Sequence, residues 1–149
     1  MVMDDAGEIR QRREAVLGAA AALEAALAAP AVELRWTEGL GNALERLRAT
    51  LDEHVTATEA PGGMIDQLRS RAPRLSNRID RLVDQHSTIT ADVEHLLEQL
   101  EHAPTERTAD DTAAIREQTL ELLGEIARHR HLGADLLYEA YDVDVGGLG

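Results

Sequence analysis

Residues 65–100 read IDQLRSRAPRLSNRIDRLVDQHSTITADVEHLLEQL, and apolar or small residues recur along this stretch in alternating steps of three and four. These positions are Ile65, Leu68, Ala72, Leu75, Ile79, Leu82, Ile89, Val93, Leu96 and Leu100. The spacing places all of them on one face of an α-helix, as in the buried seam of a helical bundle. The slot between Leu82 and Ile89 holds His86, which hydrophobic packing alone does not explain.

The composition around this seam predicts an all-α protein. Ala, Leu, Glu and Arg, which are strong helix formers, are abundant, whereas aromatic residues make up only 2% of the chain and Phe is absent. A length of 149 residues favours one domain, spanning residues 1–149, that is large enough to bury a core of its own.

The charge excludes several classes of function. The chain has 28 acidic and 15 basic residues, a formal net charge of -13, so we expect it to bind neither nucleic acid nor an anionic membrane surface.

The chain has no Cys, no Ser-based nucleophile elbow and no phosphate-binding glycine loop, so we expect no enzyme. The N-terminal residues MVMDDAGEIRQRRE lack the apolar run of a signal peptide, and no apolar stretch is long enough for a membrane span. We therefore expect a cytoplasmic, acidic protein.

Pro30, the turn sequence at 60–63 and the break at 102–105 divide the chain into helical segments. The predicted helices cover 4–29, 32–60 with an extension over 64–71, 73–101 and 109–141, followed by a loose tail at 142–149. Short connections between long helices favour an antiparallel up-down-up-down four-helix bundle. The first helix contains no His and is predicted to be purely structural.

Histidines fill seam slots on three of the four predicted helices, namely His54, His86 and His129. Counted from the break near residue 72, His54 lies 18 residues back and His86 lies 14 forward. At about 1.5 Å of rise per residue these depths differ by roughly 6 Å. The same count across the next break gives 16 residues for His86 and 18 for His129. The three side chains are therefore predicted to meet, as the ligands of a metal site in a bundle do.

Two carboxylates follow the histidines closely enough to join such a site. Glu59 lies five residues after His54, and Asp135 lies six after His129, so each must reach around its helix. Imidazole and carboxylate ligands suit iron, zinc or manganese, and the sequence does not choose among them. The candidate metal ligands are His54, Glu59, His86, His129 and Asp135.

Three motifs, in this order, resemble the hemerythrin-like (HHE cation-binding) domain family. HVTATEAPGGMIDQL at 54–68 is similar to the family's second-helix His with a trailing Glu and a helix-ending turn. APRL at 72–75 leading to LVDQHSTI at 82–89 resembles its third helix. RHRHLGADLLYEAYDVD at 128–144 resembles the fourth-helix His followed by an acidic residue. The resemblance covers roughly residues 42–142.

This resemblance implies a hemerythrin-like fold, in which such domains hold a carboxylate-bridged non-haem di-iron centre for oxygen binding, iron handling or sensing of small molecules and redox state. Here the first-helix His is missing, and Thr58 and Thr90 stand where the family has Glu and His. The resemblance thus implies a reduced His/carboxylate site that binds metal, or senses a small diatomic ligand. The alternative is a metal-free interaction or regulatory module with a hydrogen-bonded, pH-sensitive His cluster. The sequence predicts neither a protein partner nor an oligomeric state.

Overall fold

The computed structural model describes residues 2–30, 33–102 and 104–141, which are almost entirely helical and contain no strand. The elements are α1 (Val2–Ala28), α2 (Glu33–Glu59), α3 (Met64–Arg71), the 3₁₀ turn η1 (Pro73–Leu75), α4 (Ser76–Glu101), the 3₁₀ turn η2 (Pro104–Glu106) and α5 (Ala109–Ala140). The predicted all-helical bundle is confirmed. The predicted tail at 142–149 and the predicted helix start at residue 32 lie outside the described residues.

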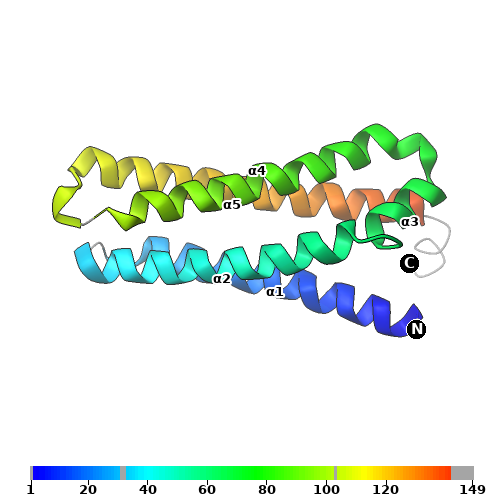
Figure 1. The fold of residues 1–149 in the computed structure, drawn as a ribbon, viewed down its shortest axis with the longest axis horizontal. Coiled ribbons are helices and arrows are strands. Elements are labelled where there is room, and N and C mark those ends of the chain that lie inside the picture. The colour runs from blue at the N-terminus through cyan, green and yellow to red at the C-terminus, as the bar shows by residue number, and fades with distance from the viewer. Residues whose placement is uncertain (1, 31–32, 103, 142–149) are drawn as a thin grey trace.

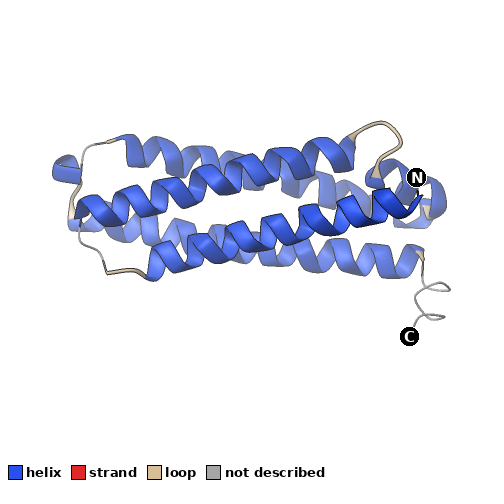
Figure 2. Ribbon diagram, turned by 90° about the horizontal axis from the view of Figure 1, so that it is seen from below, coloured by secondary structure: helices blue, strands red, loops and turns tan. Residues whose placement is uncertain are grey.

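The four long helices, α1, α2, α4 and α5, lie side by side in an elongated bundle (Figure 1). Helix α2 packs against α1 and α4, and α5 packs against α4 and α1. Figure 2 shows the start of α1 and the end of α5 at the same end of the bundle. The short helix α3 caps this end and contacts α2, α4 and α5. None of the helices in the described ranges is long and apolar enough to cross a membrane.

Local sequence signals account for the helix boundaries. The hydroxyl of Thr108 accepts a hydrogen bond from the Asp111 amide at 3.1 Å, while the Asp111 carboxylate accepts one from the Thr108 amide at 2.9 Å, which forms a capping box at the start of α5. Gly62, with φ of 75°, makes the turn between α2 and α3. The helix that was predicted to begin at residue 73 begins three residues later. Pro73 opens the 3₁₀ turn η1, and α4 itself begins at Ser76.

The buried side chains form two apolar clusters, one on either side of the histidine slots. The larger cluster joins α1, α2, α4 and α5 and ends with Leu51, Ile89 and Ile126. The smaller one packs α3 and η1 onto α4 and α5 and includes Leu82 and Leu136. The seam residues from Ile65 to Leu96 are all buried, as their spacing predicts. The boundary between the two clusters is where the three histidines lie.

Candidate metal centre

Three imidazole rings meet at this boundary: His54 from α2, His86 from α4 and His129 from α5. Their ring centroids are 5.2 Å apart for His54 and His86, 5.7 Å for His54 and His129, and 4.7 Å for His86 and His129. His86 and His129 are buried and His54 is half-buried. The predicted meeting of the three side chains is confirmed, whereas their binding of a metal stays a prediction.

His86 is held by a carboxylate from the neighbouring helix. Its Nδ1 lies 2.8 Å from Oε2 of Glu59, the last residue of α2. A carboxylate oxygen can only accept here, so Nδ1–H donates and the lone pair of the ring lies on Nε2. That Nε2 is buried and has no hydrogen-bond partner among the described residues. A buried acceptor of this kind requires a proton donor or a metal ion beside it.

His129 is oriented in the same way by an amide. Its Nδ1 lies 2.8 Å from Oε1 of Gln85 on α4, and since this oxygen is an acceptor, Nδ1–H donates again and Nε2 carries the lone pair. Sequence analysis missed Gln85. The sequence feature that could have indicated Gln85 is its position directly before His86, in the helix that packs against α5.

Electrostatics keep two of the rings uncharged. Burial, followed by the neighbouring His86 and by Arg13 and Arg12, lowers the pKa of His54 from 6.5 to about 4. Burial, followed by His86 and His54, lowers the pKa of His129 to about 3. Both side chains are therefore neutral at pH 7, which is the form that binds a metal.

The donor set fits a metal ion. One ring nitrogen from each histidine can be chosen so that all three lie within 4.8 Å of one another. Three nitrogens bound to one ion at about 2.0–2.1 Å would stand roughly 3.3 Å apart in a tetrahedral arrangement, so the rings need to move inward slightly. Oxygen partners on the other ring nitrogen, as Glu59 and Gln85 provide, are typical of histidines that bind metals.

The two predicted carboxylates occupy different places. Glu59 lies at the cluster, but its hydrogen bond to His86 makes it a support for that ring. Asp135 is exposed and does not belong to the group of His54, His86 and His129. Within the described ranges, the residues that could hold an ion together are these three histidines.

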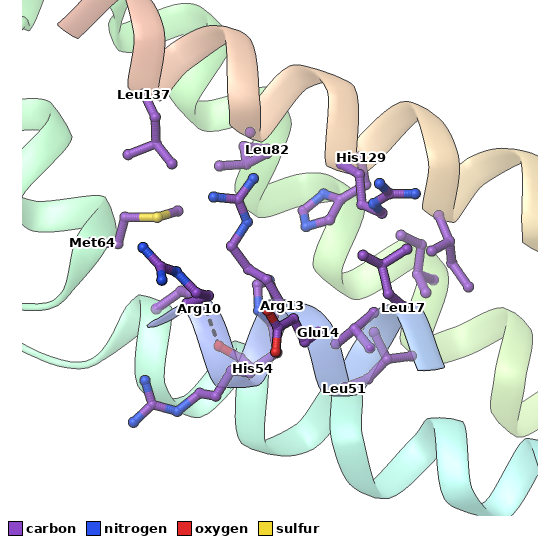
Figure 3. Close-up of a pocket in the computed structure, with 17 residues that line it drawn as sticks. Arg10, Arg13, Glu14, Leu17, Leu51, His54, Met64, Leu82, His129 and Leu137 are labelled. Carbon is purple, nitrogen blue, oxygen red and sulfur yellow. Dashed lines mark hydrogen bonds between the residues drawn. The ribbon is translucent and has the colours of Figure 1, made fainter. Parts of the chain in front are cut away.

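A cavity of about 390 Å³ opens beside His54 and His129 (Figure 3). Apolar side chains from α1, α2, α4 and α5, together with Met64 of α3, form most of its wall. Helix α1, predicted to be purely structural, also contributes arginines to this wall, including Arg10 and Arg13. A small molecule can thus reach two of the three histidines from the cavity.

Comparison of the chain with models of known protein families, with curated proteins and with solved structures found no match. The resemblance to hemerythrin-like domains therefore stays a prediction. The interpretation of the site rests on the position of its three histidines and on the hydrogen bonds that orient His86 and His129.

Proposed function

We propose that the protein is a hemerythrin-like, antiparallel up-down-up-down bundle that binds one metal ion through His54, His86 and His129. The observation that carries this proposal is the Nε2 atom of His86, which is buried without a hydrogen-bond partner among the described residues beside two other imidazoles. Its Nδ1 is fixed by Glu59, so the lone pair of Nε2 is left free in a ring that lies beside the His54 and His129 rings.

The proposed role is metal binding or the sensing of a small ligand or of redox state. Imidazole nitrogen suits iron, zinc and manganese, and the family resemblance favours iron. An ion held by three protein ligands retains an open coordination position for a small molecule such as a diatomic gas. The cavity beside His54 and His129 supplies a route to that position.

A metal-free interaction or regulatory module is the second candidate function. The three rings pack edge to face, with interplanar angles of 88°, 86° and 61°, and this packing needs no ion. In this case, the histidines would link the stability of the bundle to pH, because protonation of buried rings opposes folding.

Elemental analysis separates the two candidates. The untagged protein is expressed in iron- and zinc-supplemented medium, beside His86→Ala and a control, His95→Ala, which changes an exposed histidine of the same helix. We expect about one metal ion per chain in the wild type and in the control, and its loss from His86→Ala. Less than about a tenth of an equivalent in all three proteins would contradict metal binding and favour the metal-free module.

A further inference from the structure

The cavity beside the histidines has an apolar interior and a cationic rim. Its apolar wall includes Leu51, Met64, Leu82, Ile126 and Leu137. Arg10, Arg12, Arg13 and Arg130 also line it, with Glu14 as the acidic residue of the lining. Four guanidinium groups against one carboxylate stand out in a chain whose net charge is -13.

Three of these arginines have no partner among the described residues. Arg12 pairs with Glu8 at 3.1 Å, but no described residue forms a hydrogen bond or ion pair with Arg10, Arg13 or Arg130. Some arginines elsewhere in the chain do have carboxylate partners, as Arg69 does in Asp80 at 2.7 Å and Arg48 in Glu94 at 3.3 Å. The rim of the cavity therefore carries positive charge that the described part of the protein does not neutralise.

The cationic and apolar parts lie in an order that suits an amphipathic molecule. Figure 3 shows the side chains of Arg10 and Arg13 rising from α1 into the cavity. Met64, Leu82 and Leu137 border the region toward which these two side chains extend. A molecule with one anionic end and an apolar body can satisfy both parts at once.

We propose that this cavity binds a small monocarboxylate with an apolar chain. The carboxylate pairs with the guanidinium groups of Arg10 and Arg13, whose fork geometry matches two carboxylate oxygens, and the chain packs against Met64, Leu82 and Leu137. A volume of about 390 Å³ lies in the range of small-molecule pockets. An organic ligand with a cationic end in place of the carboxylate would be repelled by the arginines, and a molecule polar at both ends would leave its second end unpaired against an apolar wall. This proposal goes beyond metal binding and does not require it.

Calorimetric titration of metal-free protein with octanoate tests the ligand class. Octanol, octylamine, acetate and inorganic phosphate serve as comparison ligands. We expect octanoate to bind at least about tenfold more tightly than each of the other four, because it alone has both the charge and the chain. Equal binding of phosphate or acetate would contradict the need for the chain, and equal binding of octanol would contradict the role of the arginines.

Variants test the assignment of each end. Arg10→Gln/Arg13→Gln is expected to weaken octanoate binding at least about tenfold, while Arg35→Gln/Arg81→Gln, which removes two exposed arginines that do not line the cavity, leaves it unchanged. Met64→Gln keeps a similar side-chain length and is expected to weaken octanoate binding severalfold without changing the affinity for phosphate. Unchanged octanoate binding in the double variant of Arg10 and Arg13 would overturn the proposal. Since the protein is metal-free throughout, failure of metal binding leaves these results unaffected.

Discussion

The apolar half of the bundle and the half that holds the histidines are built from the same helices, yet α1 treats them differently. In the apolar half, α1 supplies Ala19 and Leu23, which are completely buried in one cluster with Leu44. Toward the histidines, the same helix supplies Arg10 and Arg13, which line a cavity and are exposed. The side chains of Ala19 and Leu23 are thus sealed in the core, whereas the charged part of α1 lines the cavity of about 390 Å³ beside the histidines.

This difference shows that the surroundings of the histidine cluster depend on α1, the helix that contributes no histidine to it. Three helices bring His54, His86 and His129 together, while α1 lines much of the cavity from which His54 and His129 can be reached. Well-packed apolar side chains exclude such access. The two halves should therefore respond differently to substitution, and most strongly in the apolar half.

The largest effect is expected in the apolar half. Leu44→Ala removes a completely buried side chain and should lower the free energy of unfolding by about 3–4 kcal/mol, since the tightly packed neighbours cannot fill the space. Urea denaturation measures this loss. Leu120→Ala, at a position that is 60% exposed, is the control and should cost less than about 1 kcal/mol. Similar losses in the two variants would mean that this half is not the rigid core of the bundle.

The histidine half should respond to pH in the metal-free protein. The folded-state pKa values of His54 and His129 are about 4 and about 3, below the unfolded value of 6.5. The unfolded chain therefore binds protons first as the pH falls below about 6.5, and stability is lost from there toward pH 4. Each histidine contributes a slope of up to about 1.4 kcal/mol per pH unit. Unfolding measured between pH 7 and pH 5 should show this slope.

Two variants assign the slope to its source. His129→Gln removes one titrating ring and should reduce the slope relative to the wild type. Glu125 affects stability in the opposite direction, because burial and the neighbouring Asp92 raise its pKa from 4.5 to about 7. The stability that protonated Glu125 contributes is fully present below pH 4.5 and is lost as the pH rises through 7. Glu125→Gln should therefore steepen the loss of stability on acidification. An unchanged slope in His129→Gln would show that other groups govern the acid limb.

A smaller effect is expected from the residue that supports His86. In Glu59→Gln a neutral amide replaces the carboxylate, so Nδ1 of His86 faces either an uncharged amide oxygen or an amide N–H, which cannot accept its proton. The variant should weaken metal affinity about 10- to 100-fold while the bundle stays folded. Competition with a chelator measures this change. Glu53→Gln, at an exposed position of the same helix, is the control and should leave affinity unchanged. Equal affinity in both variants would contradict the supporting role of Glu59.

The sequence predicted the features that follow from helical periodicity. The seam spacing placed His54, His86 and His129 on inward faces, and the residue counts from the breaks placed them at one depth, both of which the structure confirms. The prolines and glycines of the breaks also located the helix ends to within a few residues. These properties depend on chain geometry alone, so one sequence suffices to predict them.

The features that depend on side-chain reach were not predictable in the same way. Glu59 and Asp135 have similar spacing from a histidine, yet Glu59 bonds to His86 on another helix and Asp135 is exposed. The support of His129 by Gln85 also crosses between helices. The charged face of α1 was not predicted either, because a helix without His was expected to be purely structural. Such contacts depend on how helices rotate against each other, which periodicity does not specify.

The smallest effect concerns Gly133, which lies in α5 at the wall of the cavity. A Cβ atom there would stand 3.8 Å from Cδ1 of Leu82, an ordinary van der Waals contact, so Gly133→Ala should raise the free energy of unfolding by about 0.5–1 kcal/mol through helix propensity alone. Gly41→Ala, in α2 with no atom within 4 Å of the added carbon, should give the same gain, whereas Gly63→Ala should destabilise because the carbon would lie 2.7 Å from the Ala57 oxygen. A gain at residue 133 equal to that at residue 41 means that packing does not demand glycine beside the histidines. A loss of stability at residue 133 would instead place the limit of the cavity at Leu82.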